Sequence, residues 1–448
     1  MAQINTNDIL NLLIGNGPLS TKEVCDYLHI SQPVCSRLLG RLTEKVLVTG
    51  RARATRYAAK RNIAGVGTNI PIYKINEKGT ASHWGTLTAL EPTGFYFESR
   101  DTNILNQYYA GPPYFLDDLT PSGFLGRLLP RYYSMFPADI RHWTEADCFK
   151  YWTDFGWDLI GNLILGEKAF QLYLQHAQTK KTVAKSQSQV SIYAKLAINI
   201  LKEGAGGSSA GGEQPKFLAV SQKNSQDVLV KFSPPLTNAI ARRLGDLLVC
   251  EHLAHKVLNE RGTLACRSRL MKDASRIYLE SERFDRVGLV GRRGVVSLRA
   301  LDLEFVGGLC NWSQTALELM RQQIIATQTF LQIRFLEFFG KLIGNTDMHA
   351  GNLSFFMEGT TALPLAPAYD MLPMLYFPQH DELVTRDLEL PVPSPADADA
   401  WRAACLGAQA FWQQTLEHSW ITKEFKKIAK ENLKKIKTYS VINKFLPK

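Results

Sequence analysis

Apolar residues recur at helical spacing in some segments of this chain and alternate with polar residues in others. Within the first sixty residues, the helical spacing predicts a short helix over residues 8–14 and a second over residues 20–28. Ser20, with Glu23 three residues later, forms a capping box that opens the second helix. A third helix is expected from Gln32, so the chain should begin with a small helical module.

The third predicted helix has one apolar face and one polar face. Cys35, Leu38 and Leu42 recur at i, i+3 and i+7 and should point toward a core. The polar residues left outside are Gln32, Ser36, Arg37 and Arg41. This pair of helices predicts a helix-turn-helix, in which the later helix suits the major groove of DNA.

An arginine-rich wing is expected directly after this helix. Residues 46–50 and 53–58 should form two short strands around a tight turn. The basic residues that would then face phosphates or a minor groove are Arg51, Arg53, Arg56, Lys60 and Arg61. The segment resembles winged helix-turn-helix regulators, although modules of this size also serve protein contacts alone.

A glycine-rich segment, residues 203–216, precedes a predicted hairpin. Glycine lets backbone N–H groups approach phosphate oxygens, but the segment lacks a Walker A ending and could equally be a linker. Alternation predicts strands over residues 217–220 and 228–232. The second strand carries Lys231, which either points to solvent or, behind a glycine loop, holds phosphates.

Two carboxylates on the next predicted helix, residues 238–258, are candidate partners of Lys231. They are Asp246 and Glu251, and Glu251 is favoured. A lysine held by a helix carboxylate is the arrangement that steadies ATP phosphates in kinases.

A polar loop follows an apolar helix expected over residues 323–343. It places Asp347 and Asn352 five residues apart, and Asp370 follows in an apolar context. In a kinase the first Asp accepts the proton of the attacking hydroxyl, while the Asn and the later Asp hold magnesium. The alternative is that Asp347 and Asn352 simply cap a turn.

Taken in order, these motifs resemble the HipA family of bacterial serine/threonine kinases, the toxins of toxin–antitoxin pairs. The resemblance covers about residues 80 to 400 and includes residues 115–123 and 158–161 of an amino-terminal subdomain. The segments that carry it most specifically are residues 208–212, 228–231, 282–286, 343–352 and 369–370.

The resemblance implies a role for each matched residue. Asp347 would be the catalytic base, His349 would sit beside the nucleotide, and Asn352 and Asp370 would bind Mg²⁺. Adenine would lie against the backbone of Glu282 and Phe284. The residues that would bind the ATP phosphates are Ser208, Ser209, Ala210, Gly211, Gly212 and Lys231.

The resemblance also implies self-silencing through autophosphorylation of a loop serine, at Ser208 or else Ser209. An aminoacyl-tRNA synthetase as substrate and growth arrest as outcome are implied in the same way. This chain departs from the family pattern Gly-Ala-x-x-Lys, because it has an extra residue and Pro215 before Lys216.

Composition adds a nucleic-acid partner to this picture. The 448 residues carry a formal charge of +10 and a pI near 9.1, a larger excess of positive charge than nucleotide binding requires.

Seven scattered cysteines without a Cys-x-x-Cys pair predict reduced thiols and a cytoplasmic location. No apolar run of membrane-spanning length occurs, and the polar amino terminus does not resemble a secretory signal.

We therefore expect a multidomain α+β protein, a winged helix-turn-helix followed by a HipA-like two-lobed kinase fold. The expected divisions are residues 1–65 for the winged helix, 80–285 for the amino-terminal subdomain and kinase N-lobe, 286–415 for the C-lobe, and 416–448 for a basic helical tail. That tail would be an amphipathic helix on the kinase body or a second DNA contact.

The expected activity is transfer of the ATP γ-phosphate to a protein serine or threonine, with ATP and Mg²⁺ as cofactors and a growth-inhibitory outcome. The expected partners are DNA and a protein substrate, with a homodimer as a further option and no membrane. The alternative is a DNA-binding transcriptional regulator whose kinase-like body only senses nucleotide or is inactive.

Overall fold

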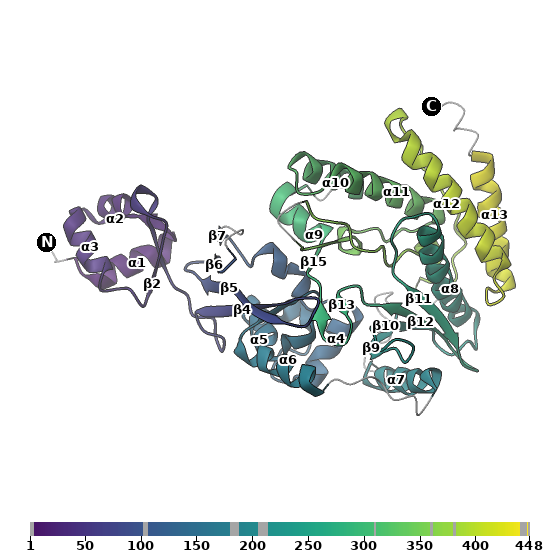
Figure 1. The fold of residues 1–448 in the computed structure, drawn as a ribbon, viewed down its shortest axis with the longest axis horizontal. Helices are drawn as coiled ribbons and strands as arrows, with labels where there is room; N and C mark the ends of the chain where they lie inside the picture. The colour runs from purple at the N-terminus through teal and green to yellow at the C-terminus, as the bar shows by residue number, and fades with distance from the viewer. Residues whose placement is uncertain are drawn as a thin grey trace.

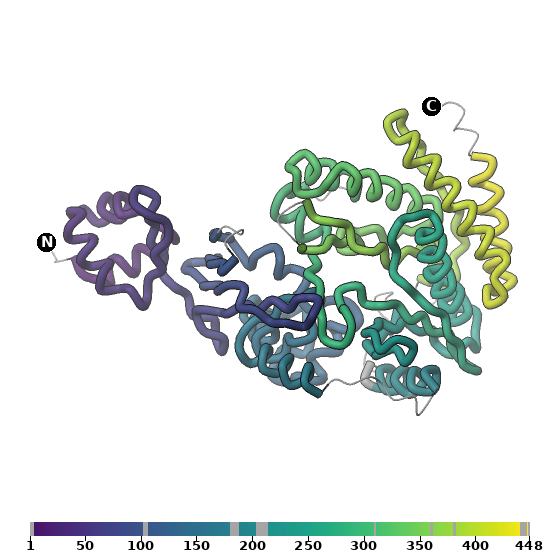
Figure 2. The backbone as a smooth tube through the Cα atoms, viewed as in Figure 1, coloured from purple at the N-terminus to yellow at the C-terminus, as the bar shows by residue number. Residues whose placement is uncertain are grey.

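The computed structural model describes residues 4–101, 106–179, 188–204, 214–308, 311–358, 362–379, 382–439 and 446. The molecule is elongated, with a small helical module at one end of its long axis and the helices α12 and α13 at the other (Figure 1). The same path can be followed as a tube in Figure 2, where a short connection joins the amino-terminal module to the rest of the chain.

The amino-terminal module is a winged helix-turn-helix. Its helices are α1 (Thr6–Asn16), α2 (Thr21–Leu28) and α3 (Gln32–Leu39), and its strands β1 (Leu19–Ser20), β2 (Val46–Thr49) and β3 (Arg56–Ala59) pair in the order β1-β3-β2. The predicted capping box is present, because Ser20 Oγ accepts from Glu23 N at 3.2 Å and Glu23 accepts from Ser20 N at 2.7 Å. The predicted second wing strand was placed too early: residues 52–54 form a 3₁₀ turn, so this strand begins at Arg56.

A five-stranded antiparallel sheet follows the winged helix. Its strands are β4 (Asn69–Ile75), β5 (Ala81–Ala89), β6 (Phe95–Ser99), β7 (Gln107–Tyr109) and β8 (Leu163–Leu165), in the order β7-β6-β5-β4-β8. Helices α4 (Gly123–Tyr132), α5 (Glu145–Phe155) and α6 (Glu167–Thr179) complete this middle region. An aromatic core that includes Phe95, Phe149 and Trp152 joins α5 to the sheet.

A second antiparallel sheet forms the N-lobe of the kinase-like body. Strands β9 (Lys216–Val220), β10 (Asp227–Phe232), β11 (Ser268–Lys272) and β12 (Ile277–Glu282) lie in the order β11-β12-β10-β9, so the predicted hairpin is correct to within a residue at each strand start. Helix α7 (Gln189–Gly204) packs Tyr193 and Ala197 against one face of this sheet, and α8 (Ala239–Glu260) packs on the other. The expected segment of residues 80–285 thus covers the second sheet and most of the first, which have separate cores, but it leaves out β4.

The C-lobe is mostly helical. It contains α9 (Leu298–Leu301), α10 (Trp312–Arg321), α11 (Thr327–Ile343), α12 (Ala398–Glu417) and α13 (Lys423–Tyr439), with short strand pairs β13 (Arg286–Val287) with β14 (Gly291–Arg292) and β15 (Val295–Ser297) with β16 (Ser354–Phe356). Helix α11 begins four residues later than predicted, because the preceding turn holds Gln323 at φ 61°.

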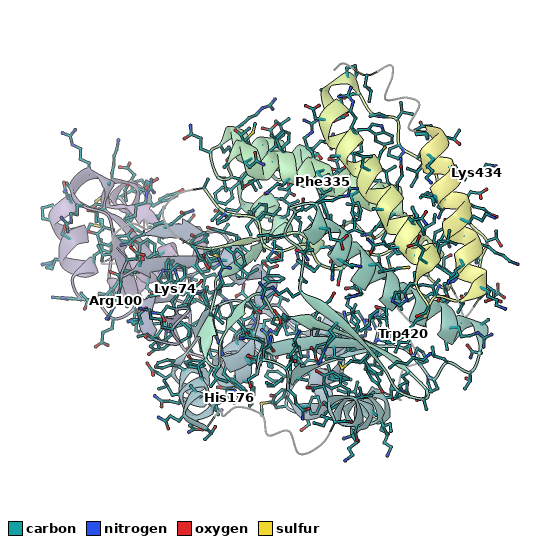
Figure 3. All side chains as sticks on the ribbon, turned by 45° about the vertical axis from the view of Figure 1, so that its right-hand side comes forward. Lys74, Arg100, His176, Phe335, Trp420 and Lys434 are labelled. Carbon is teal, nitrogen blue, oxygen red and sulfur yellow. The ribbon has the colours of Figure 1, made fainter. Side chains whose placement is uncertain are left out.

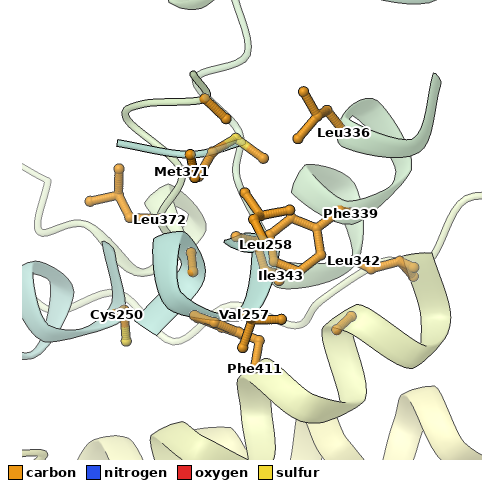
Figure 4. Packing of buried hydrophobic residues seen from close by; sticks show 14 of the residues in the cluster. Cys250, Val257, Leu258, Leu336, Phe339, Leu342, Ile343, Met371, Leu372 and Phe411 are labelled. Atoms are coloured by element: carbon orange, nitrogen blue, oxygen red, sulfur yellow. The ribbon is translucent and has the colours of Figure 1, made fainter. Parts of the chain in front are cut away.

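The C-lobe core holds the helix that delivers the polar loop. Phe339 and Ile343 of α11 pack with Leu258 of α8, Phe411 of α12 and Met371 (Figure 4). The same core takes the apolar face of α13, where Phe425, Ala429, Leu433 and Ile436 are buried. The carboxyl-terminal amphipathic helix therefore lies on the kinase-like body, and no helix in the described ranges is long and apolar enough to cross a membrane.

Candidate active site and nucleic-acid interface

Three charged side chains meet where the two lobes face each other. Lys231 of β10 donates from Nζ to both carboxylate oxygens of Glu251 on α8, each at 2.8 Å, and also to Asp370 Oδ1. Lys231 is 5% exposed and Glu251 is 1% exposed, whereas 33% of the surface of the Asp370 side chain is exposed to solvent. The solvent-facing alternative for Lys231 is therefore wrong, and the lysine bridges the N-lobe to the C-lobe.

Lys231 and Asp370 hold each other in their charged forms. Burial would raise the pKa of Asp370, but the Lys231 ammonium overcomes this effect and lowers that pKa to about 2. Burial would lower the pKa of Lys231, yet Asp370 and Glu251 raise it above its ordinary value. Burial raises the pKa of Glu251, although the Lys231 ammonium opposes this rise.

Helical geometry decides which carboxylate of α8 reaches Lys231. Asp246 and Glu251 are five residues apart, which turns them by roughly 140° on a helix of 3.6 residues per turn. Glu251 faces the sheet, whereas Asp246 faces Thr422 and accepts from its backbone N at 2.8 Å and its hydroxyl at 2.6 Å. The sequence-based preference for Glu251 is confirmed by this contact.

A second lysine, Lys216, belongs to the same cluster and was missed as a site residue. It begins β9, the strand directly after the glycine-rich segment, and stands opposite Lys231 in the antiparallel register. Opposed residues in such a pair share one face of the sheet. Its positive charge helps to lower the pKa of Asp370. It also opposes the rise that burial causes in the pKa of Glu251. Period-two alternation across the predicted hairpin was the signal that could have found it.

The polar loop after α11 is fixed by its own side chains. Gly344 ends the helix at φ 79°, in the left-handed region. Asn345, 5% exposed, accepts from the backbone N of Asp347 at 3.1 Å and donates to the backbone oxygen of Asp370 at 3.2 Å. Asn352 donates from Nδ2 to the backbone oxygen of Asp347 at 2.8 Å. The loop therefore presents the Asp347 carboxylate outward, with no hydrogen bond to it from any described residue, and Asn345 is a positioning residue that the sequence did not reveal.

The predicted metal ligands lie on two segments that these bonds tie together. The Asn352 amide nitrogen is used within the loop, which leaves its oxygen available as a ligand. Asp370 Oδ1 accepts a hydrogen bond from Lys231, and the other carboxylate oxygen of Asp370 accepts none from the described residues. Two oxygen donors, completed by phosphate oxygens and water, suit Mg²⁺. The described residues contain no cluster of three or more His, Cys, Asp or Glu side chains that would bind a metal without such a partner.

Aromatic contacts connect the loop to the segment between the lobes. The Tyr369 hydroxyl donates to the backbone oxygen of Gly351 at 2.7 Å, and its ring lies 5.7 Å from that of Phe284. His349 is exposed, and its Nδ1 accepts from Gly351 N at 3.1 Å, which turns the other ring nitrogen outward. The backbone N of Glu282 donates to Arg267 O at 2.8 Å, whereas that of Phe284 bonds to no described residue.

A buried ion cluster anchors this inter-lobe segment to the middle region. Asp285 accepts from Arg283 at 2.9 Å, from Arg286 at 2.7 Å and from the backbone N of Gly161 at 2.9 Å. Arg286 also donates to Asp158 at 2.8 Å. Burial would raise the pKa of Asp285, but the two arginines lower it well below its usual range. These contacts explain why the sequence motifs at residues 158–161 and 282–286 occur together.

The predicted phosphate loop cannot be placed by the same geometry. Ser208, Ser209, Ala210, Gly211 and Gly212 lie outside the described residues, as does the polar segment 180–187. Helix α7, which packs on the N-lobe sheet, ends at Gly204, and β9 of that sheet begins at Lys216.

The predicted nucleic-acid residues are exposed on the winged helix. Those with solvent-facing side chains are Gln32, Ser36, Arg37, Arg41, Arg51, Arg53 and Arg56. Arg56 makes an ion pair at 3.5 Å with Glu23, both half-exposed. The prediction that Arg61 faces phosphates is wrong. Arg61 forms an ion pair at 2.8 Å with Glu145 of the middle region and donates to Leu90 O, so it stabilises the junction between the two regions.

Comparisons with known proteins agree with this architecture. Residues 208–438 match a family model described as the HipA-like C-terminal domain, residues 66–174 match the YjjJ-like toxin middle domain, and residues 8–56 match the MarR family. Toxin YjjJ of Escherichia coli (strain K12) is 36% identical over 439 residues, which cover 96% of this chain and 97% of that protein.

The solved HipA of Shewanella oneidensis MR-1, in complex with HipB and its operator DNA, is similar in fold. The two structures superpose with a TM-score of 0.50 at 12% sequence identity. The match covers 81% of this chain and 95% of the HipA chain. The expected fold class, a winged helix-turn-helix followed by a HipA-like two-lobed body, is confirmed.

Proposed function

This chain belongs to the family of HipA-like toxins, and from that premise we propose that it is an ATP- and Mg²⁺-dependent serine/threonine protein kinase that also binds DNA through its winged helix. The observation that carries the kinase proposal is the contact of Lys231 with both Glu251 and Asp370. A lysine held by a helix carboxylate and placed beside a metal-binding Asp is the arrangement that kinases need for phosphate transfer.

The chemistry follows from the free groups of the polar loop. The Asp347 carboxylate accepts the proton of a serine or threonine hydroxyl as that oxygen bonds to the γ-phosphorus. The bond from this phosphorus to the β,γ-bridging oxygen breaks, and ADP leaves with the electron pair. Lys231 and Lys216 offset phosphate charge on the N-lobe side, and Mg²⁺ held by Asn352 and Asp370 would neutralise the charge that develops on the phosphates.

The test is incubation of the purified chain with labelled ATP, Mg²⁺ and bacterial cell extract, followed by phosphosite mapping. Asp347→Ala should lower transfer by roughly a hundredfold to ten-thousandfold, because general-base catalysis contributes that much. Asp399→Ala, which removes a fully exposed carboxylate on α12, is the matched control. Growth arrest on expression should be lost with the first variant and kept with the second.

A DNA-binding regulator with an inactive kinase-like body is the alternative. It predicts nucleotide binding without phosphate transfer by the parent protein in this assay. Equal transfer by the parent and Asp347→Ala would instead disprove the assignment of the catalytic base.

For the winged helix, we propose that α3 enters the major groove and that the wing contacts phosphates. Support comes from the exposure of Arg51, Arg53 and Arg56. Each phosphate contact releases counterions, so replacing all three arginines by Ala should lower the salt slope of duplex binding by roughly three. An unchanged slope in fluorescence-anisotropy titrations would remove the wing from the interface.

A further inference from the structure

The chain after Asp370 returns to the base of the polar loop. Leu375 N donates to Gly344 O at 2.9 Å, and a Cβ placed on Gly344 would lie 3.4 Å from Leu388 Cδ1. Leu375 and Leu388 therefore pack against the start of the loop that carries Asp347. The segment between them is thus tied to the first residue of the loop that carries the candidate catalytic base.

Part of this segment has an unpaired backbone. Within the described chain, residues 383–387 make no backbone–backbone hydrogen bond and belong to no helix or strand. Leu383 is 38% exposed and Val384 is 44% exposed. An exposed, irregular segment with free N–H and C=O groups can pair with an added extended peptide, and its apolar side chains can contact that peptide.

A groove runs between this segment and α13. It encloses a cavity of about 240 Å³, lined by Val384 and Leu388 on one side and by Ile428 and Lys435 on the other. Arg243, Arg386 and Lys435 line it together with only two carboxylates, Asp387 and Glu431. The volume admits one aliphatic side chain, which Val384, Leu388 and Ile428 can contact.

The α13 wall of the groove adds further positive charge. Its exposed lysines, of which Lys434 is labelled in Figure 3, lie opposite the face that packs in the C-lobe core. Neither Lys434 nor Lys435 makes an ion pair with any residue that the structure describes. Because the lining carries three cations against two carboxylates, and Lys435 has no ion-pair partner among the described residues, charge complementarity favours an acidic partner.

We propose that this groove docks an extended acidic segment of the protein substrate, with one aliphatic side chain in the cavity and its backbone along residues 383–387. The proposal rests on the kinase function and adds the chemistry of the substrate. It places the docking site on the C-lobe, where Leu388 lies next to Gly344 at the base of the polar loop, apart from Lys231 on the N-lobe sheet.

The experiment uses the full chain and two fluorescein-labelled peptides. One has a central leucine and serine flanked by glutamates, and its counterpart has lysines in place of the glutamates. Fluorescence anisotropy measures binding, and labelled ATP measures transfer to each peptide. Lys435→Glu reverses a charge in the groove, and Lys430→Glu reverses one on the exposed part of α13 outside it.

We expect the parent to bind the acidic peptide and Lys435→Glu to bind it roughly fivefold more weakly, as for reversal of one exposed ion pair. Lys430→Glu should bind like the parent, and Val384→Asp should also weaken binding. Preference for the basic peptide, or equal loss in both lysine variants, would overturn the docking proposal.

The binding measurement separates this proposal from the kinase proposal. Acidic-peptide binding that depends on Lys435 without any phosphate transfer would preserve the groove and refute the kinase. Phosphate transfer that is unchanged by the groove variants would support the kinase proposal and refute the docking proposal. Binding of a labelled DNA duplex that is lost in Lys435→Glu, with no peptide binding, would identify this face as a nucleic-acid contact instead.

Discussion

Removal of the Lys231 cation tests the buried site most directly. Lys231→Met keeps a long apolar stem but leaves Glu251, 1% exposed, without the ammonium that contacts both of its oxygens at 2.8 Å. Breaking a buried pair by removing one partner costs about 3–5 kcal/mol, which corresponds to a fall in the melting temperature of the kinase-like body of roughly 6–20 °C.

The pH dependence of this loss has a defined sign. Burial already raises the pKa of Glu251, and without Lys231 that pKa must rise further. A carboxyl whose folded pKa exceeds its unfolded pKa binds more protons in the folded state, so its contribution to stability falls as pH rises through that window. The melting-temperature difference between Lys231→Met and the parent should therefore be smaller near about pH 5 than near about pH 8.

Differential scanning calorimetry of the full chain at both pH values provides the measurement. The double variant Lys231→Met with Glu251→Leu should recover most of the lost stability, because no uncompensated charge remains buried. Lys256→Met, which breaks a half-exposed pair with Glu260 at 3.7 Å on the same helix, is the control and should cost less than about 1 kcal/mol. A pH-independent loss, or a double variant no more stable than the single one, would refute the argument that Glu251 is buried as a charge.

Three further predictions concern other parts of the molecule. Asn345→Ala should lower kcat by up to roughly a hundredfold with a smaller change in the KM for ATP, since Asp347 loses its support; steady-state kinetics would test this. Burial raises the pKa of Asp246 to about 6, so stability should fall as pH rises from about 4 to about 6, and Asp246→Asn should flatten that decline in urea unfolding. Ser208→Ala, or Ser209→Ala, should remain active longer in ATP than the parent, because a loop phosphate would repel the nucleotide phosphates; absence of both phosphoserines after incubation would contradict this.

Local sequence rules placed several elements of this protein correctly. The capping box of Ser20 and Glu23 fixes the start of α2, because both bonds lie within one turn. Alternation located the hairpin that carries Lys231. The spacing of Asp347 and Asn352 placed both on one loop, where the asparagine amide bonds to the backbone of the aspartate. Each of these features depends on residues close together in the chain.

Contacts between distant segments escaped the same rules. Arg61 looks like a wing arginine by composition, yet Glu145 lies beside it only because the middle region packs against the end of the wing. Asn345 acts on Asp370, 25 residues away, and Asp285 pairs with segments more than a hundred residues earlier. No periodicity in the sequence encodes which charges meet across such separations.

The amino-acid sequence by itself determined the winged helix, the hairpin and the polar loop, because helix caps, strand alternation and loop spacing are local properties. Tertiary structure alone decided that Lys231 bonds to both Glu251 and Asp370, that Lys216 shares its face, and that residues 383–387 form a groove with α13. The physical reason is that sheet register, helix rotation and the packing of α8, α11 and α13 in one core set these distances.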